Sequence, residues 1–196
     1  QLELLVGRAQ FGVVKIGLIP SLDFLDRLLK RLERLGVEVP LVWDPILSAS
    51  AGFDFHAEAV GRSEVRERMV ALMERVDLAT PNRQEYEWIF GEGVGQLSSP
   101  PCDLLVKSAL EREGESGREV GDLLLLKSGE RLEFWSRKSE GVSKHGSGCV
   151  LSSLIAAGLA RGERVEKSIE RALPLFQRFF LSSQSALGIW RNEELI

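Results

Sequence analysis

The residues best suited to chemistry lie in the segment K-H-G-S-G-C, 144–149, which combines two glycines with a cysteine at the start of an apolar helix. Gly146 and Gly148 lack the Cβ atoms that keep a ligand away from the backbone. The first N–H groups of a helix have no intrahelical partner, and the positive end of its dipole favours an anion there. The segment, with Ser147 inside it, therefore predicts a phosphate site, and the same field is expected to lower the pKa of the Cys149 thiol.

Two plainer interpretations of this segment are open. A Gly-x-Gly sequence before a helix often serves only close packing. A cysteine in an apolar helix is more often buried and inert than reactive. We expect the neighbouring His145 to hydrogen-bond within the loop, because no second His, Cys or carboxylate lies at metal-ligand spacing from it. The residues that the fold brings near the loop therefore decide between the interpretations.

Four polar side chains stand at or after the ends of predicted strands: Asp44 follows L-V-W, Asn82 and Glu85 follow V-D-L-A-T, and Lys107 closes the strand that begins D-L-L-V. In parallel sheets ligands bind outside the carboxyl ends of the strands, so we expect these side chains to face the phosphate site. Carboxylate and amide oxygens suit Mg²⁺, and a lysine suits phosphate oxygens. With the anion site they provide what phosphoryl transfer needs, because positioning and charge stabilisation carry that reaction.

Each of these four residues also has a purely structural interpretation. Asp44, followed by Pro45, is typical of the start of a turn. Asn82 is suited to cap the helix that follows, with Glu85 as its capping-box partner, and this role is compatible with a ligand role. Lys107 can simply extend into water from an edge strand. The sequence alone leaves both sets of roles open.

The order of the predicted elements indicates an α/β protein with a largely parallel sheet. Strands are expected at 12–17, 39–43, 76–80 and 103–107, and a hairpin at 121–127 and 131–135 adds a mixed edge. Helices are expected at 22–35 after an N-cap at Ser21, and at 63–75, 82–90, 149–161 and 165–183. Pro174 is expected to kink or restart the last helix. The charged, glycine-containing stretch 111–118 predicts a mobile flap.

Composition places the chain among ordinary globular domains. Its 196 residues suffice for one core, with 44 % hydrophobic and 28 % charged residues. The net charge is −4 and basic residues are interspersed with acidic ones, which argues against a nucleic-acid-binding face, and no apolar run reaches the length of a membrane span. Two cysteines without a secretory signal indicate a reducing cytoplasm. Because the chain begins at Gln1 and enters a helix-like pattern at once, we expect an N-terminal portion of the natural protein to be absent.

Five motifs together resemble one known family: K-I-G-L, W-D-P-I-L, T-P-N-R-Q-E, L-L-V-K and H-G-S-G-C-V-L-S-S-L-I-A-A. In this order and spacing, over residues 14–180, they resemble the hydroxymethylpyrimidine (phosphate) kinases of thiamin biosynthesis, in the ribokinase-like superfamily. The resemblance implies one ribokinase-like domain, a three-layer α/β/α sandwich with a mostly parallel central sheet. It also implies ATP and Mg²⁺ as cofactors, a small pyrimidine as substrate and, in many members, a homodimer.

The resemblance implies a role for each candidate residue. Residues 146–148 match the anion-hole loop. Cys149 matches the proposed catalytic base and stands where most of the superfamily has Asp, which is typical of the pyrimidine-kinase branch. Asn82 and Glu85 match an Asn-x-x-Glu motif associated with Mg²⁺ and phosphate.

Two further residues match the nucleotide side of the family's site. Asp44 corresponds to the acidic residue near the phosphates and the metal, and Lys107 to a lysine of the nucleotide site. After that lysine the family continues Gly-Gly-His, whereas this chain has Ser108-Ala109-Leu110. Near the C-terminus S-A-L-G-I-W replaces a Gly-rich segment, and the family's N-terminal G-x-D-x-S-G-G-A-G pattern, which holds the pyrimidine, is not in this chain.

The activity that the resemblance implies is ATP-dependent phosphorylation of the hydroxymethyl group of 4-amino-5-hydroxymethyl-2-methylpyrimidine. Whether the monophosphate is phosphorylated as well is open. Two alternatives remain at this point. One is a pyridoxal or pyridoxine kinase of the same fold, and the other is a non-catalytic ligand-binding relative.

Overall fold

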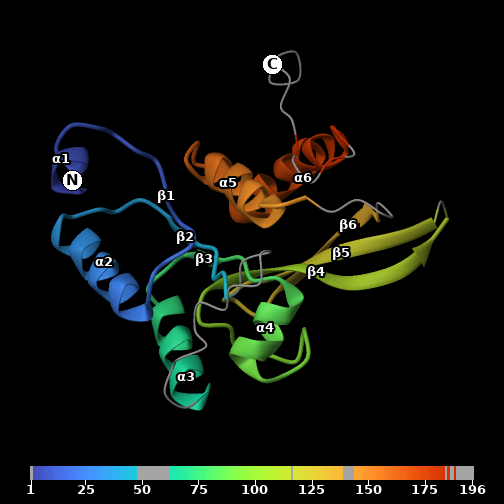
Figure 1. The fold of residues 1–196 in the computed structure, drawn as a ribbon, viewed down its shortest axis with the longest axis horizontal. Coiled ribbons are helices and arrows are strands. Elements are labelled where there is room, and N and C mark those ends of the chain that lie inside the picture. The colour runs from blue at the N-terminus through green and yellow to red at the C-terminus, as the bar shows by residue number, and fades with distance from the viewer. Residues whose placement is uncertain are drawn as a thin grey trace.

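A computed structural model describes residues 2–47, 62–115, 117–138, 144–183, 185 and 188. Within these ranges a six-stranded sheet lies between two layers of helices (Figure 1). The strands are β1 (Val14–Ile16), β2 (Leu41–Trp43), β3 (Leu78–Ala79), β4 (Asp103–Gly114), β5 (Gly117–Leu125) and β6 (Arg131–Arg137). The helices are α1 (Leu2–Val6), α2 (Leu22–Arg34), α3 (Arg62–Met73), α4 (Arg83–Phe90), α5 (Ser147–Leu159) and α6 (Val165–Leu181).

The sheet has a parallel half and an antiparallel half. Strands β1 to β4 pair parallel in chain order, and β4, β5 and β6 form an antiparallel meander. Parallel neighbours need crossover connections, which contain α2, α3 and α4 among the described residues. The predicted mostly parallel sheet with a mixed edge is confirmed. Strands β1 to β3 end at one edge of the sheet, where Asp44 and Asn82 follow β2 and β3, whereas β4 continues past this edge with Lys107 inside it.

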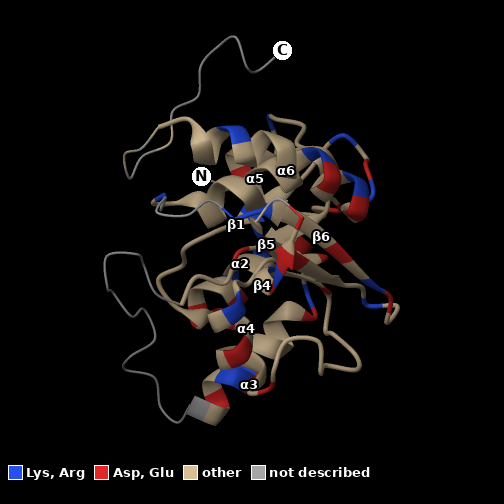
Figure 2. Ribbon diagram, turned by 90° about the vertical axis from the view of Figure 1, so that its right-hand side faces the viewer, with Lys and Arg blue, Asp and Glu red and all other residues tan. Residues whose placement is uncertain are grey.

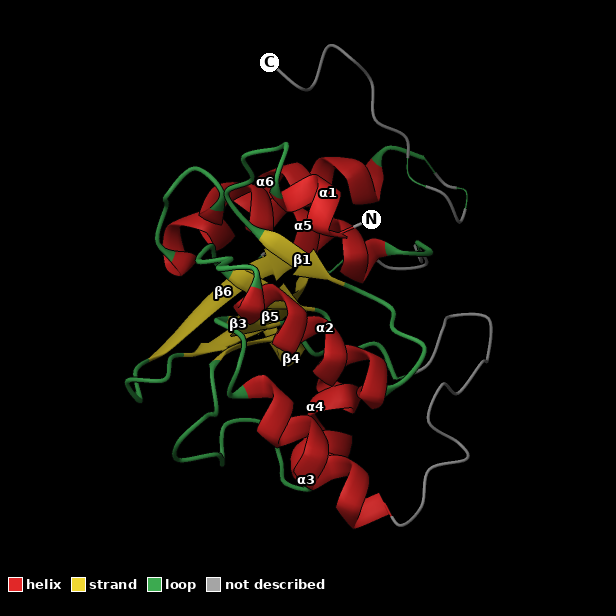
Figure 3. Ribbon diagram, turned by 90° about the vertical axis from the view of Figure 1, so that its left-hand side faces the viewer, coloured by secondary structure: helices red, strands yellow, loops and turns green. Residues whose placement is uncertain are grey.

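Helices cover both faces of the sheet, as the predicted three-layer sandwich requires (Figure 3). Helices α2, α3 and α4 pack on one face through a core that includes Trp43 and Leu104. Helices α5 and α6 pack on the other face through a core that includes Val42 and Leu105. Neighbouring residues of one strand thus enter opposite cores, as the alternation of side chains along a strand dictates. The two cores fix the sheet between the layers and so fix the positions of its strand ends.

The described residues of the segment predicted as a flap are strand except for the turn residue Glu115, so that prediction is wrong. β4 continues to Gly114 and β5 begins at Gly117, and the two strands extend together from the body of the protein (Figure 1). The charges pair across the ribbon, with Arg112 bound to Glu119. The Arg112 guanidinium also lies 3.9 Å from the centre of the Trp135 ring on β6. Charge in this stretch therefore marks a solvated two-faced ribbon and does not mark a loop.

The other element predictions hold with shifts of a few residues at the boundaries. The Ser21 side chain accepts the Phe24 N–H at 3.1 Å and caps α2 as predicted. Helix α6 runs from Val165 to Leu181 with Pro174 inside it, so the helix does not restart there. No helix in the described ranges is both long and apolar enough to cross a membrane. Basic and acidic residues are interspersed over the face seen in Figure 2.

Candidate active site

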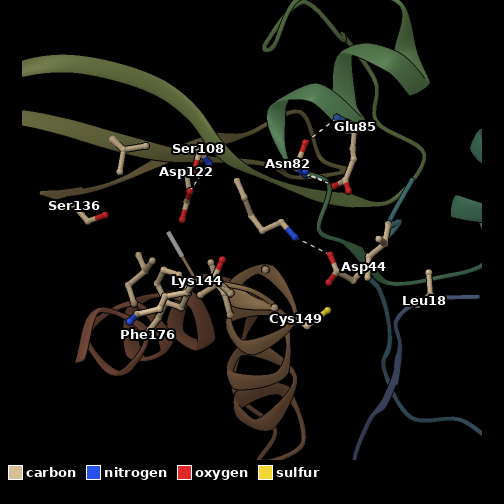
Figure 4. Close-up of a pocket in the computed structure, with 18 residues that line it drawn as sticks. Leu18, Asp44, Asn82, Glu85, Ser108, Asp122, Ser136, Lys144, Cys149 and Phe176 are labelled. Atoms are coloured by element: carbon tan, nitrogen blue, oxygen red, sulfur yellow. Dashed lines mark hydrogen bonds and ion pairs between the residues drawn. The ribbon is translucent and has the colours of Figure 1, made fainter. Parts of the chain in front are cut away.

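All eight candidate residues line one cavity of about 510 Å³ at the carboxyl edge of the parallel strands (Figure 4). They come from four places in the fold: the end of β2, the start of α4, the middle of β4 and the start of α5. These residues are Asp44, Asn82, Glu85, Lys107, Gly146, Ser147, Gly148 and Cys149. The structure thus brings together residues that are more than a hundred positions apart, as their places at strand ends predict.

A buried ion pair lies at the centre of the cavity wall. Lys107 Nζ donates to Asp44 Oδ1 at 2.7 Å, and the two residues are only 9 % and 1 % exposed. Burial disfavours the charge on Asp44, but the ammonium of Lys107 and its hydrogen bond outweigh burial, so the pKa of the carboxyl lies below its ordinary value. Lys107 therefore does not extend into water from an edge strand, which was one interpretation of the sequence.

Two hydroxyl groups complete the surroundings of Asp44. Thr80 Oγ1 donates to Asp44 Oδ1 at 3.1 Å, and Ser152 Oγ lies 3.2 Å from Oδ2. Ser152 Oγ also lies 3.1 Å from the carbonyl oxygen of Cys149, so it connects the carboxylate to the first turn of α5. Both oxygens of Asp44 thus have donors within the protein, and a fixed carboxylate faces the cavity.

The start of α4 carries the predicted capping box. Asn82 Oδ1 accepts the Glu85 N–H at 2.9 Å, and Glu85 Oε2 accepts the Asn82 N–H at 2.7 Å. Burial raises the pKa of the Glu85 carboxyl, although its hydrogen bond and Lys107 oppose the shift. The structural interpretation of this pair is therefore correct. Because both side chains also line the cavity, a ligand role stays open.

The start of α5 is built differently. Its N-cap is Gly146, with φ +73°, a left-handed conformation that costs a residue with a Cβ but not glycine, and no side chain caps the helix. A Cβ on Gly148 would lie 3.1 Å from Lys107 Nζ, so glycine there lets the lysine approach the first turn. The first-turn amides and the lysine ammonium together give the cavity a positive wall suited to an anion.

Cys149 lies in the first turn of α5, next to Asp44 (Figure 4). The expected lowering of its pKa is wrong. Burial and the nearby charge of Asp44 raise the pKa of the thiol above its ordinary value, while Lys15 and Lys107 oppose the shift. The sequence shows the helix start but does not show that a buried carboxylate lies beside the sulfur. Cys149 is half-buried, so it is neither inert core nor an exposed thiolate.

Sequence reasoning missed three polar residues around these groups: Thr80, Ser152 and Asp122. Asp122 lines the cavity, is 9 % exposed and accepts the Ser108 N–H at 2.7 Å. It had a signal in the sequence, because it is a single carboxylate before a run of four leucines. Thr80 and Ser152 had none, since threonine at a strand end and serine in a helix are common.

The remaining wall of the cavity is mixed. Apolar side chains line it at Val120, Leu173 and Phe176, on β5 and α6. Lys144, just before the Gly146 loop, is 4 % exposed and donates to Ser183 Oγ at 2.9 Å, which connects that loop to the end of α6. The C-terminal segment S-A-L-G-I-W, which stands where the family has a Gly-rich segment, lies largely outside the described residues. Apolar side chains from β5 and α6 thus line the cavity together with its charged, anion-attracting groups.

Comparison with known proteins places the chain in a family. Residues 1–186 match the family model of phosphomethylpyrimidine kinase. The chain is 28 % identical over 184 residues to the chloroplast thiamine biosynthetic bifunctional enzyme of Arabidopsis thaliana, with 88 % of the chain and 34 % of that protein covered. It is 27 % identical over 165 residues to the hydroxymethylpyrimidine/phosphomethylpyrimidine kinase of Streptomyces coelicolor, with 81 % of the chain and 59 % of that protein covered.

The fold also matches solved structures. The pyridoxal kinase of Bacillus subtilis, solved as an ADP complex, superposes with a TM-score of 0.70 at 18 % identity, over 94 % of this chain and 71 % of that chain. At this identity the likeness shows the fold alone. The chain spans about a third of the length of the Arabidopsis relative and 59 % of the Streptomyces relative.

Proposed function

The chain belongs to the phosphomethylpyrimidine kinase family, and from this premise we propose that its cavity binds Mg²⁺ and ATP and transfers the γ-phosphoryl group to the hydroxymethyl group of a pyrimidine. The observation that carries the proposal is the convergence of all eight candidate residues on one cavity. Close packing alone would explain the glycines, and capping alone would explain Asn82 and Glu85. Neither explains why these groups meet a buried lysine–carboxylate pair.

The phosphates of ATP are proposed to bind between Lys107 and residues 146–148. The lysine supplies a positive charge, and the first-turn amides of α5 supply donors that have no side-chain cap. Asp44 keeps the lysine in place through the 2.7 Å contact. Fixed donors aimed at the equatorial oxygens are the main means by which a protein stabilises a loose phosphoryl-transfer transition state.

Cys149 is proposed as the group that accepts the hydroxyl proton of the substrate. Its raised pKa keeps the thiol largely protonated at neutral pH. The minority that is thiolate is a stronger base than an unperturbed cysteine thiolate, because the pKa is raised. A loose transition state demands proton removal late, when the bond to phosphorus has largely formed. The amides of residues 146–148 then lie beside the transferring group, and the Cys149 thiolate takes up the hydroxyl proton and becomes the thiol.

The oxygen atoms that the protein offers suit a magnesium ion whose ligands are mostly phosphate oxygens and water. Both oxygens of Asp44 already accept hydrogen bonds, so we propose that Asp44 acts on the ion through water. Glu85 keeps a buried carboxylate at the cavity wall, and Asn82 lies beside it. The ion would neutralise charge on the phosphates, and these residues would orient its water shell.

The apolar side chains of Val120, Leu173 and Phe176 in the cavity wall are proposed to contact the nucleoside portion of ATP. The Arabidopsis and Streptomyces relatives, by their names, act in thiamine biosynthesis or on hydroxymethylpyrimidine and phosphomethylpyrimidine, and we extend that substrate class to this chain. A second transfer onto the monophosphate would use the same anion site.

The free cysteines Cys102 and Cys149 fit a reducing cytoplasm.

The test uses the protein expressed from its complete gene. It is incubated with Mg²⁺, ATP and either 4-amino-5-hydroxymethyl-2-methylpyrimidine or pyridoxal, and products are identified by mass spectrometry. We expect phosphorylated pyrimidine to form much faster than pyridoxal phosphate. Faster formation of pyridoxal phosphate would overturn the substrate and support a pyridoxal kinase. Binding of both compounds without any product would overturn the catalytic proposal.

A further inference from the structure

Strand β4 leaves its regular pairing with β5 where it enters the cavity. Val106 pairs with Leu123, and the next recorded pair is Leu110 with Gly121. β4 therefore advances by four residues while β5 advances by two, and three residues of β4 lie opposite the single residue Asp122. A bulge of this kind bends a strand and redirects its side chains. It is here that β4 supplies the lysine of the site.

The bulge contains an unusual backbone conformation. Ser108 has φ +50°, and it is the only residue other than glycine with a positive φ in the part of the chain that the structure describes. A left-handed conformation brings Cβ close to the following carbonyl oxygen, so it costs free energy for any L-residue with a side chain. Such a conformation persists only where the surroundings hold it.

Asp122 is what holds it. Its Oδ1 accepts the Ser108 N–H at 2.7 Å, within the range of a strong charge-assisted bond, and the carboxylate is 9 % exposed (Figure 4). On the other side of the strand the Lys107 N–H donates to the Pro81 carbonyl at 2.8 Å. The backbone at the lysine is thus fixed from both sides, by β3's extension and by the side chain of Asp122.

We propose that Asp122 is a positioning residue for Lys107: by holding Ser108 in its left-handed conformation it keeps the lysine ammonium directed at Asp44 and at the first turn of α5. The inference rests on the proposed function for its consequence, which is nucleotide affinity. It also gives a reason for the departure from the family's Gly-Gly-His, because a serine needs an external restraint in a conformation that glycine adopts freely.

The first experiment compares two aspartates that hold a backbone amide in the same way. Asp122→Ala is expected to weaken the binding of Mg²⁺ and ADP, measured by calorimetry, by about tenfold, a size typical of residues that share one network. The matched control is Asp103→Ala. Asp103 Oδ1 accepts the Lys127 N–H at 2.8 Å, but it lies at the start of β4, at the opposite edge of the sheet. The control is expected to lower the melting temperature and to leave the ADP affinity within about twofold. Equal losses of affinity in both variants would overturn the proposal.

A second experiment separates positioning from direct contact with the ligand. If Asp122 acts through the lysine, Asp122→Ala has little further effect on ADP affinity in a Lys107→Met background. A full tenfold loss there would mean that Asp122 contacts the nucleotide itself, and would overturn the positioning role. Asp122→Asn keeps an acceptor oxygen and is expected to recover most of the affinity. It also provides a folded variant should Asp122→Ala fail to fold.

A third experiment tests the backbone step alone. Because glycine needs no restraint at this φ, Asp122→Ala is expected to cost less affinity in a Ser108→Gly background than in the unaltered protein. In the ligand-free protein, hydrogen exchange of the Ser108 amide is expected to accelerate in Asp122→Ala, and unchanged exchange would overturn the proposal. This readout does not depend on phosphoryl transfer. A protein that exchanges as expected but forms no product would refute the proposed function and leave the positioning role standing.

Discussion

Two helices begin at the wall of the same cavity and treat their first amides in opposite ways. At α4 the Asn82 side chain accepts the Glu85 N–H, and the Glu85 side chain accepts the Asn82 N–H. These two side chains close the start of the helix. At α5 the N-cap is Gly146, and no side chain caps the helix. The glycine opens the helix end to the cavity, whereas the asparagine closes it.

The difference teaches which groups have spare binding capacity. Satisfying the amides of a helix end stabilises the folded protein, and leaving them unsatisfied gives up that stability in exchange for an anion site. Side chains in the closed end are already occupied, so their contribution to a ligand is limited. The following substitutions break or sharpen this contrast between a closed and an open helix start, in order of expected effect.

The largest effect is expected at the open end, at Cys149. Loss of a general base typically lowers turnover by about 10² to 10⁴, so Cys149→Ala should reduce kcat by that factor with a small change in KM for ATP. In the unaltered enzyme kcat should rise with pH through the neutral range, because the pKa of the thiol is raised and the thiolate fraction grows with pH. Steady-state kinetics at a series of pH values across and above neutrality measures both the loss of kcat in the variant and the rise of kcat with pH in the unaltered enzyme.

The matched control is the second thiol of the chain. Cys102 is 2 % exposed and borders the amino edge of the sheet with Asp77 and Asp103, and burial raises its pKa to about 12. Cys102→Ala should cost some stability and leave kcat near that of the unaltered protein. Full turnover in Cys149→Ala would remove the base assignment.

The next effect is expected between the two helix starts, at the buried ion pair. Lys107→Met leaves the Asp44 carboxylate buried without its cation, a change that typically costs about 3–5 kcal/mol of unfolding free energy. Without Lys107 burial should raise the carboxyl pKa, so the loss is expected to be full at neutral pH and to shrink as the pH falls and protonation removes the charge. Denaturant unfolding at several pH values measures this.

An exposed pair provides the reference for that experiment. Lys30 Nζ lies 2.7 Å from Asp26 Oδ2, as close as the buried pair, but the lysine side chain is 56 % exposed. Lys30→Met should change the unfolding free energy by about 0.5 kcal/mol or less. A similar loss in both variants would mean that the pair at the cavity is not electrostatically special.

A smaller effect is expected at Gly148, and mainly on activity. Alanine favours a helix over glycine by up to about 1 kcal/mol, which offsets the strain on the Lys107–Asp44 contact, so Gly148→Ala should change the melting temperature little. Its Cβ would lie 3.1 Å from Lys107 Nζ, and displacement of the ammonium should lower kcat/KM by about ten- to a hundredfold. Gly146→Ala is the counterpart, because it meets no atom within 4 Å but strains a φ of +73° and should cost about 1–2 kcal/mol of stability.

The sequence was sufficient to predict the closed helix start and insufficient to predict the chemistry of the open one. An asparagine followed three residues later by a glutamate is local information, and the capping box follows from it. The pKa of Cys149 depends on burial and on the charge of Asp44, which lies more than a hundred residues away and becomes its neighbour only through the sheet. Local patterns identified the groups, but not their distances.

The same distinction explains the other gains and misses. The parallel half of the sheet was predictable, because the alternation of strands and helices is itself a local pattern. The order in the 111–118 ribbon was not, since the ion pair between Arg112 and Glu119 exists only once the strands have paired. Likewise, the bulge opposite Asp122 follows from the pairing register of β4 with β5, and no local sequence pattern predicts it.

The smallest effect is expected at Asn82, and it tests whether this residue only caps α4 or also takes part in nucleotide binding. Removing an N-cap side chain costs about 1 kcal/mol, so Asn82→Ala and Ser21→Ala should destabilise the protein by similar amounts, because both side chains accept an amide three residues on. Ser21 caps α2 outside the cavity lining. If Asn82 also orients the magnesium–phosphate shell, only Asn82→Ala raises KM for ATP, by about threefold to tenfold, the loss expected when one hydrogen bond of ordinary strength is removed. Equal KM values in the two variants would restrict Asn82 to capping and would leave Glu85 as the acidic group of that wall.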